Sequence, residues 1–359
     1  MKKYLSEKGF AHHIILPLLV IAAVIAIGFT TLRLIKADTV TTDGSTFRIA
    51  TYNIRATRLS KSAWDTKRAN AILDYIKSVD VVGLQETQRE TVNLGSKHKA
   101  VSVANRSETW LTNELATAGY SRTTPTVSPR YGETNYDNGE DRVIFWNKHK
   151  FAMVTQGQNA VTDDTTANDE IALEGNESLA KHRNLVWVKL KEISSGKVFY
   201  FLTTHLTWGG STGSYKAVRG TQITQILDYI GSHMTDAPVI LVGDMNSRTN
   251  SAEDKCFTSG FSDAKNVKDS KGQYQYYQEC LYRAGGGFSD AYKIATTKQN
   301  MNYSTAIANF KGGLSGDVNT TDARHIDHIY VKNGVSVSRV EVVKQKGSDH
   351  LPVEADVSL

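Results

Sequence analysis

The chain has 359 residues, of which 40% are hydrophobic and 22% charged, and this composition is typical of a globular protein. Its formal net charge is +5, but residues 1–37 contain five of the 42 basic residues and one of the 37 acidic ones. The remainder carries 37 basic and 36 acidic residues. This balance excludes a global electrostatic footprint for nucleic acid and leaves only a local basic patch open.

The first 37 residues differ from the rest of the chain. No residue between Lys8 and Arg33 carries a formal charge, and this stretch is long enough to cross a bilayer core, which needs ~20 residues. Three lysines precede it, so the positive-inside rule places the N-terminus in the cytoplasm and the rest of the chain outside. We therefore expect a membrane anchor, with residues 14–31 as its apolar segment.

This interpretation divides the chain into an anchor over residues 1–37, a polar tether over 38–46 and one folded domain over 47–359. The protein is then expected at the cell membrane as a single-pass protein with an extracytoplasmic domain. A cleaved signal peptide ending near Ile35-Lys36-Ala37 is the alternative, and it would give a secreted protein.

Beyond the tether, strands alternate with amphipathic helices, which predicts an α/β or α+β fold in one large domain. Residues 157–184 lack apolar periodicity and are expected to form a long surface loop. We expect strands at 47–52, 81–84, 143–146, 185–190, 198–204, 239–242, 326–331, 335–343 and 351–357, and helices at 64–79, 110–118 and 217–230.

The sequence contains two cysteines, Cys256 and Cys280. Because an exported chain with an even number of cysteines is permissive for disulfides, we expect a bridge between them. Two unrelated free thiols are the alternative.

Polar side chains follow several of the predicted strands at the point where each strand ends. A single case is unremarkable, and Gly243-Asp244-Met245-Asn246 alone also fits a turn. Because polar residues recur at the ends of several strands, we expect them to share one rim of the fold. The residues in these positions are Asn53, Glu86, His205, Asp244, Asn246, Asp327, Asp349 and His350.

These residue types limit the chemistry. Glu86, Asn53 and Asp349 offer the oxygen ligands that Mg²⁺ prefers, and His205 and His350 can exchange protons near neutral pH. The sequence has no zinc-type Cys/His spacing, no G-x-S-x-G elbow and no Walker A loop. Metal-assisted hydrolysis of a phosphate ester fits best. Each histidine taken singly also fits a structural role.

Six ordered motifs resemble the endonuclease/exonuclease/phosphatase superfamily, and the nearest resemblance is to its deoxyribonuclease I-like branch. The resemblance covers residues 47–357 and implies a four-layer α-β-β-α sandwich of two packed mixed sheets. The motifs are Thr51-Tyr52-Asn53-Ile54-Arg55, Leu84-Gln85-Glu86-Thr87, Thr204-His205-Leu206, Gly243-Asp244-Met245-Asn246, Ile326-Asp327-His328-Ile329 and Ser348-Asp349-His350-Leu351-Pro352-Val353.

The resemblance also implies a role for each site residue. Glu86 would be the main metal ligand, with Asn53 and Asp349 beside it. Asp244 would orient or deprotonate the attacking water, and Asn246 would hold the phosphate. The remaining implied roles are those of Asp327, which would orient His350, of Glu140, which would orient His205, and of Arg55 and Arg183, which would contact substrate phosphate.

Two departures weaken the case for DNA as the substrate. The nuclease tyrosine of the family falls near Asn138, with Tyr136 two residues away, and an arginine expected just after Glu86 is displaced to Arg89.

We therefore expect a membrane-anchored, monomeric phosphodiesterase that uses Mg²⁺, with Mn²⁺ or Ca²⁺ as alternatives, and that cleaves DNA or RNA. A lipid or small-molecule phosphoesterase, similar to a sphingomyelinase or an inositol phosphatase, is the alternative within the enzyme class. A catalytically silent binding module is the alternative outside it.

Overall fold

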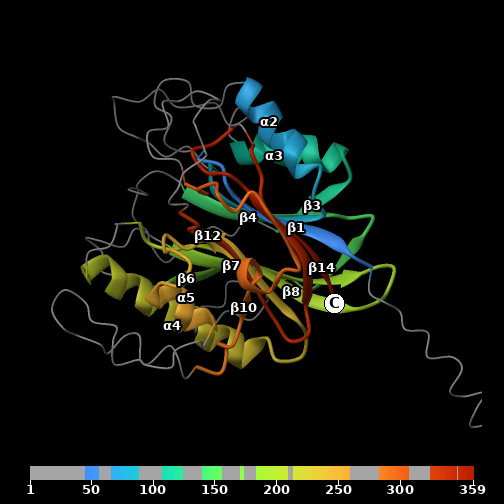
Figure 1. Ribbon diagram of the computed structural model, residues 1–359. Coiled ribbons are helices and arrows are strands. Elements are labelled where there is room, and N and C mark those ends of the chain that lie inside the picture. The colour runs from blue at the N-terminus through green and yellow to red at the C-terminus, as the bar shows by residue number, and fades with distance from the viewer. Residues whose placement is uncertain are drawn as a thin grey trace, which may run out of the picture. The chain divides into compact units, whose positions relative to one another are not determined.

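Two mixed β-sheets form the middle layers of the fold (Figure 1). In the first sheet, β1 and β2 are parallel neighbours, and β1 also pairs antiparallel with β14. The strand order is β11–β13–β14–β1–β2–β4–β3. The strands are β1 (Phe47–Asn53), β2 (Val81–Gln88), β3 (Tyr120–Arg122), β4 (Glu140–Asn147), β11 (Thr297–Gln299), β13 (Ser336–Val342) and β14 (Val353–Ser358).

In the second sheet, β8 and β9 are parallel neighbours, and β9 also pairs antiparallel with β12. The strand order is β10–β12–β9–β8–β7–β5, and β6 also pairs with β7. The strands are β5 (Phe151–Thr155), β6 (Glu170–Leu173), β7 (Arg183–Glu192), β8 (Val198–His205), β9 (Val239–Asp244), β10 (Ser289–Asp290) and β12 (Asp327–Lys332).

Helices cover the outer face of each sheet (Figure 1). Helices α2 (Thr66–Ile76) and α3 (Ser107–Thr117) pack on the first sheet, and α4 (Gly213–His233) and α5 (Ala252–Thr258) pack on the second. A short helix, α7 (Ala291–Ile294), follows β10. The layers are therefore helix, sheet, sheet, helix, as the resemblance implied, and the expected fold class is confirmed.

Strand alternation explains the two faces of each sheet. In β9, Ile240 and Val242 contribute to the core between the sheets, whereas Val239 and Leu241 face α4 and α5. All four are fully buried, which agrees with the prediction of a strand buried on both faces. The sheets approach closely at Gly83, where a Cβ would lie 2.6 Å from Thr203 Oγ1 and 2.7 Å from a methyl of Val242.

The computed structural model describes residues 45–55, 66–88, 107–123, 140–155, 170–173, 183–208, 213–258, 283–306, 324–345 and 347–359. All of them belong to the unit Gly44–Leu359. The expected anchor or signal segment, residues 1–37, lies outside the described residues, as does most of the tether. Among the described helices, none is long and apolar enough to cross a membrane.

One element prediction is wrong. Residues 157–184 are not a loop throughout, because β6 (Glu170–Leu173) pairs antiparallel with β7, which itself begins at Arg183. A four-residue strand shows too little alternation to be separated from polar surroundings. Cys256 is disulfide-bonded, as expected, while Cys280 lies outside the described residues.

Candidate active site

The strand ends of the second sheet bring three of the predicted site residues into register. His205 ends β8 and lies opposite Asp244, which ends the parallel strand β9. Asp327 begins the antiparallel strand β12 and lies opposite Asp244 from the other side. The row His205, Asp244, Asp327 therefore crosses one edge of the sheet, as the polar residues at strand ends predicted.

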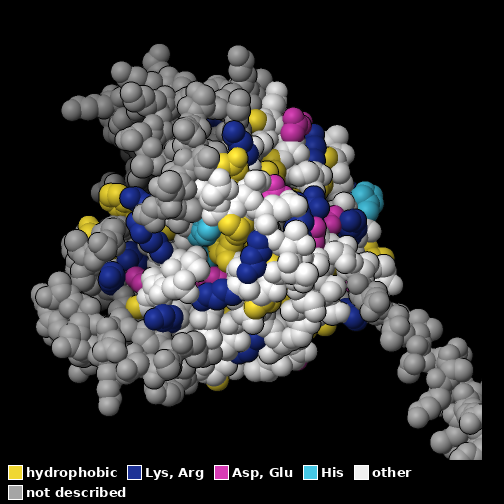
Figure 2. Space-filling view, viewed as in Figure 1, with side chains coloured by type: hydrophobic (Ala, Val, Ile, Leu, Met, Phe, Trp, Pro, Cys, Tyr) yellow, Lys and Arg dark blue, Asp and Glu magenta, His cyan; other side chains and the backbone are white. Residues whose placement is uncertain are grey.

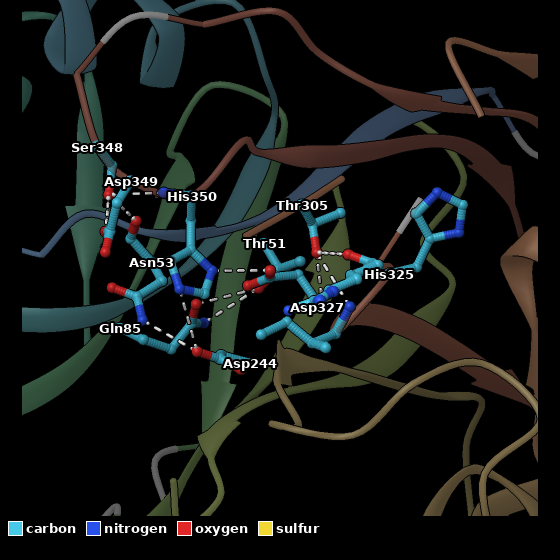
Figure 3. Close-up of polar contacts among 12 residues, drawn as sticks. Thr51, Asn53, Gln85, Asp244, Thr305, His325, Asp327, Ser348, Asp349 and His350 are labelled. Atoms are coloured by element: carbon cyan, nitrogen blue, oxygen red, sulfur yellow. Dashed lines mark hydrogen bonds and ion pairs between the residues drawn. The ribbon is translucent and has the colours of Figure 1, made fainter. Parts of the chain in front are cut away.

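His350 joins this row from the segment that precedes β14. Its Nδ1 lies 2.8 Å from Asp327 Oδ2, and its Nε2 lies 3.7 Å from Asp244 Oδ2 (Figure 3). We call Asp244, Asp327 and His350 the first cluster. Their ligand atoms lie within 4.8 Å of one another, and all three residues are buried. The predicted contact between His350 and Asp327 is therefore present.

Asn53 links the two sheets at the site. Its Nδ2 donates to Glu86 Oε1 at 3.0 Å and to Asp244 Oδ2 at 3.1 Å, while its Oδ1 accepts from the backbone of Arg55 at 3.0 Å. In this arrangement Asn53 holds two carboxylates together through its amide nitrogen. Its predicted role as a metal ligand stays a prediction.

Glu86 occupies an irregular point of β2. The pairing of β2 with β4 shifts register between Gln85 and Thr87, and Glu86 has a φ of 55°. A bulge of this kind redirects a side chain out of the regular alternation. Arg55 and Asn246 also have positive φ, at 42° and 48°. Left-handed backbone at residues other than glycine is uncommon and tends to occur at functional sites.

His205 has a different partner from His350. Its Nδ1 lies 2.8 Å from Arg183 Nη1, and its Nε2 lies 3.3 Å from Asp244 Oδ2. Because a guanidinium can only donate, Nδ1 of His205 accepts, and the neutral ring carries its proton on Nε2. Arg183 is buried beside His205, and its predicted contact with substrate phosphate stays a prediction.

Glu140 was expected to orient His205. It begins β4, where its backbone pairs with Gln88, but its side chain lies outside the described part of the chain. Two other expected site residues, Asn246 and Asp349, lie within the described part of the chain. Asn246 Nδ2 donates to the carbonyl oxygen of Leu206 at 2.9 Å, and Asp349 forms an ion pair with Arg55.

Burial and neighbouring charge shift the protonation of the first cluster. Burial, with the charge of Asp327, raises the pKa of Asp244 to about 7. Burial opposes the charged form of His350, but the carboxylates of Asp327 and Asp244 outweigh it and raise the pKa of His350 well above its ordinary value. The metal-free cluster therefore favours bound protons, as expected where carboxylates are crowded in a buried place.

The same crowding suits a divalent cation. Asp327 Oδ1 is buried and makes no hydrogen bond, and a buried carboxylate oxygen without a donor is costly unless a cation meets it. Asp244, Asp327 and His350 could hold such an ion when deprotonated, and Glu86, which Asn53 joins to Asp244, offers a second position beside them. The mainly oxygen donor set fits a hard ion such as Mg²⁺.

Asp254, Asp290 and His328, which we call the second cluster, are also buried within 4.8 Å of one another. Here Lys293 Nζ lies 2.8 Å from Asp254, and His328 Nδ1 lies 3.5 Å from Asp290. His328 Nε2 lies 3.1 Å from the carbonyl oxygens of Ser247 and His325, so it carries a proton. This cluster contains its own cations and acts as structural support.

Several residues that support the site have no signal in the sequence. The buried Arg68 of α2 donates to the carbonyl oxygens of Ile54, Arg55 and Gly347, and so fixes the segments that precede Asp349 and follow Asn53. Gln85 Nε2 donates to Thr203 Oγ1 at 2.8 Å and joins the two sheets beneath the site. Their positions depend on chain pairing over long distances, which local pattern does not report.

Two further hydroxyl groups position the first cluster. Thr305 Oγ1 accepts from the backbone of Asp327 at 3.2 Å. Ser348 Oγ donates to the carbonyl oxygen of Asn53 at 2.7 Å and thereby ties the segment carrying His350 to the end of β1 (Figure 3). The second contact could have been anticipated, because Ser348 lies within the motif that carries Asp349 and His350.

Known proteins share this architecture. A solved structure of an endonuclease/exonuclease/phosphatase from Bacteroides vulgatus is 22% identical with a TM-score of 0.59, and the match covers 88% of this chain and 99% of that one. A mannosyl-6-phosphatase of Bacteroides thetaiotaomicron is 19% identical with a TM-score of 0.56, covering 87% of this chain and 100% of that one. These similarities concern the fold.

A curated relative matches at the level of sequence. It is a probable 3′-5′-exoribonuclease subunit, Ccr4, of the CCR4-Not complex of Encephalitozoon cuniculi, and it is 24% identical over 207 residues. The match covers 56% of this chain and only 38% of the relative.

The family model described as the endonuclease/exonuclease/phosphatase family matches residues 50–350, which run from β1 to His350 and so span all the strand ends that build the site. The chain belongs to that family, whose members hydrolyse phosphoester bonds.

Proposed function

We propose that the protein is a divalent-metal-dependent phosphodiesterase and that its substrate is DNA or RNA. The main support for hydrolysis is the geometry around Asp244. The His350–Asp327 pair faces Asp244, and Asn53 joins Asp244 to Glu86. An imidazole held by one carboxylate and facing another is suited to proton transfer, which a binding module does not need.

In this proposal each residue of the site has a distinct part. Asp244 orients the attacking water and accepts its proton, as a new bond forms from the water oxygen to phosphorus and the bond to the leaving oxygen breaks. His350, kept protonated by Asp327, donates its Nε2 proton to the leaving oxygen, and His205, through its Nε2–H, donates a hydrogen bond to a phosphoryl oxygen. A bound Mg²⁺ would polarise the phosphate, with Glu86, Asn53 and Asp349 as its proposed ligands beside the first cluster.

Nucleic acid is proposed as the substrate because the curated relative is described as an exoribonuclease. Arg55 supports this, since it lies at the end of β1 beside Asp349 with about a quarter of its side chain exposed (28%). Among the described residues on the face shown in Figure 2, lysine and arginine side chains are dispersed among other residues. Few phosphate contacts are therefore expected, and the slope of log K against log salt should be shallow, about −2 to −4.

One observation favours a phosphomonoester or another small substrate as the second candidate. The two arginines expected to contact successive phosphates are not equivalent, because Arg183 is buried against His205. Arg55 alone provides a single phosphate contact, which suits a lipid headgroup, a sugar phosphate or an inositol phosphate. The mannosyl-6-phosphatase with the same fold is consistent with this alternative.

A substrate panel separates the candidates. The full chain, purified in detergent, is incubated with duplex DNA, RNA, a phosphodiester lipid, an inositol phosphate and a simple phosphomonoester, each with Mg²⁺, Mn²⁺ or Ca²⁺. We expect cleavage of DNA or RNA that is abolished by chelator and by Glu86→Gln. Intact nucleic acid with hydrolysis of a lipid or monoester would move the assignment to the second candidate. Inactivity on the whole panel would favour a binding module.

The cellular placement is also a proposal. We propose that residues 14–31 anchor a single-pass membrane protein with its catalytic domain outside the cytoplasm. The support is the long uncharged stretch after three lysines. The protein should then partition with membranes and retain its first residues. A soluble form that begins near Asp38 would show that the segment is a cleaved signal peptide.

A further inference from the structure

An exposed tryptophan follows the active-site end of β8. Trp208 has 64% of its surface exposed, whereas Trp146 and Trp187 are at most 7% exposed. Indole rings are mostly buried because of their large apolar area. Since three residues span at most ~10 Å of extended chain, the Cα of Trp208 lies within that distance of the Cα of His205. The molecule therefore exposes a large aromatic side chain on the segment that directly follows the active-site end of β8.

The backbone that leads to Trp208 is fixed on the side of the active site. The N–H of Leu206 donates to the carbonyl oxygen of Asp244 at 2.9 Å, and the carbonyl oxygen of Leu206 accepts from Asn246 Nδ2 at 2.9 Å. Both partners belong to the strand end that carries the first cluster. Any shift of this segment would therefore disturb the site itself.

The next residue, Thr207, is fixed on the opposite side by helix α4. Gln222 accepts from the N–H of Thr207 at 3.1 Å and donates to its Oγ1 at 2.8 Å. Arg219 Nη1 donates to the carbonyl oxygen of Thr207 at 3.1 Å, and Arg219 is itself held by Glu253 at 3.0 Å. Arg219 and Gln222 are almost completely buried. All four backbone polar groups of residues 206 and 207 are thus paired.

We propose that Trp208 is a stacking platform for a nucleobase of the substrate, next to the phosphate that is cleaved. A side chain on a fixed backbone segment loses little backbone entropy when a planar ligand stacks on it, and base stacking on aromatic side chains tolerates any sequence. A nucleobase is joined to its phosphate through one sugar, so a platform a few residues from His205 is suitably placed. The inference rests on the proposed function, because it names the part of that substrate which the site recognises.

The test compares ligands with and without a base. Binding of adenosine 5′-monophosphate and of ribose 5-phosphate is measured by calorimetry in the full chain with Mg²⁺, in a His350→Ala background that prevents turnover. We expect the nucleotide to bind about 5- to 150-fold more tightly than the sugar phosphate. Trp208→Ala should abolish this preference, and Trp208→Phe should retain most of it.

The matched control is Ile193→Ala. Ile193 is 53% exposed and follows β7, in the hairpin before β8 and so at the other end of that strand from His205. Its replacement should leave the preference unchanged. Absence of a preference in the wild-type sequence, or a Trp208→Ala variant that binds both ligands as before or weakens both equally, would overturn the proposal.

A kinetic arm separates this inference from the proposed function. With His350 intact, Trp208→Ala should raise KM for an oligonucleotide by a similar factor and leave kcat nearly unchanged, because stacking contributes equally before and during the reaction. Cleavage of nucleic acid with an unaltered KM in Trp208→Ala would overturn the platform alone. A base preference that depends on Trp208, without cleavage of any nucleic acid, would overturn the proposed function alone.

Discussion

The first and second clusters contain the same residue types, one histidine and two aspartates, and both are buried. They differ in what surrounds them. In the second cluster, Asp254 accepts from Lys293 Nζ, from the phenol of Tyr330 and from the backbone of Asn250. Each cluster keeps one buried carboxylate oxygen without a hydrogen bond, Asp327 Oδ1 in the first and Asp290 Oδ2 in the second. In the first cluster, Asp244 has its pKa raised to about 7 by burial and the charge of Asp327.

This difference shows that residue types alone do not identify a reactive site. In the second cluster, Lys293 faces Asp254 and His328 faces Asp290, so the two carboxylate charges are compensated within the fold. The first cluster has an excess of carboxylate over cationic partners among the described residues, and that excess is suited to an external cation and a phosphate. Strongly perturbed acids in such surroundings are candidates for function.

The largest expected effect follows from replacing the histidine of the first cluster. His350→Ala should lower kcat by about 10²- to 10⁴-fold, since general acid–base catalysis contributes on that scale, and the variant should still fold although it loses the buried pair with Asp327. Steady-state kinetics and circular dichroism measure the two quantities. A variant that retains wild-type turnover would remove His350 from the mechanism.

The corresponding change in the second cluster should affect stability. His328→Ala removes the partner of the buried Asp290, and breaking a buried ion pair in this way costs about 3–5 kcal/mol of unfolding free energy. Urea unfolding gives that value, and kcat of the remaining folded protein should change little. Equal losses of kcat in the two variants would mean that the clusters do not have separate roles.

Metal should act at the site formed by Glu86 and the first cluster, and not at the second cluster. Mg²⁺ at 100 times its dissociation constant should raise the free energy of unfolding by about 2.7 kcal/mol, measured as a shift in Tm. Glu86→Gln should largely abolish the shift, whereas Asp290→Asn should retain it. If Asp290→Asn removed the metal response, the second cluster would be the metal site.

The pH dependence of the metal-free protein should also separate the clusters. The pKa of Asp244 is raised from 3.8 to about 7 by burial and the charge of Asp327, so between these values the native state binds more protons than the unfolded state. The free energy of unfolding should therefore fall as pH rises from about 4 to 7. Asp244→Asn should remove this part of the slope, measured by urea unfolding at several pH values.

His328 differs from Asp244 because its contribution to stability is lost at higher pH. Burial disfavours its charged form, but Asp290 outweighs this and raises its pKa above 6.5. The stability it provides is complete below pH 6.5 and is lost as pH rises through the raised value. A slope between pH 4 and 6 that persists in Asp244→Asn and disappears in His328→Ala would contradict this assignment.

The sequence predicted the fold, and it predicted which residues lie together at these strand ends, for a physical reason. A buried strand is a run of apolar residues, and polar residues at its end stand out, so His205, Asp244 and Asp327 could be found without knowing the pairing. The motifs then predicted that His350 meets Asp327, and this contact is present at 2.8 Å.

What could not be predicted depends on long-range pairing. The bulge at Glu86 arises from the register of β2 against β4, and the guanidinium of Arg183 meets His205 only because β7 and β8 are neighbours. Local pattern carries no information on either. The short strand β6 was missed for the same reason, since only its pairing with β7 defines it.

The pairing of β1 with β14 has a consequence for how the protein acquires activity. Phe47 lies opposite Val357, and Thr51 opposite Val353, so the strand that carries Asn53 is completed by residues roughly 300 positions later. Such non-local contacts slow folding because a large loop must close first. During synthesis at about 5–20 residues per second, the site remains incomplete until β14 emerges. The nascent chain is therefore expected to stay inactive until β14 can pair with β1.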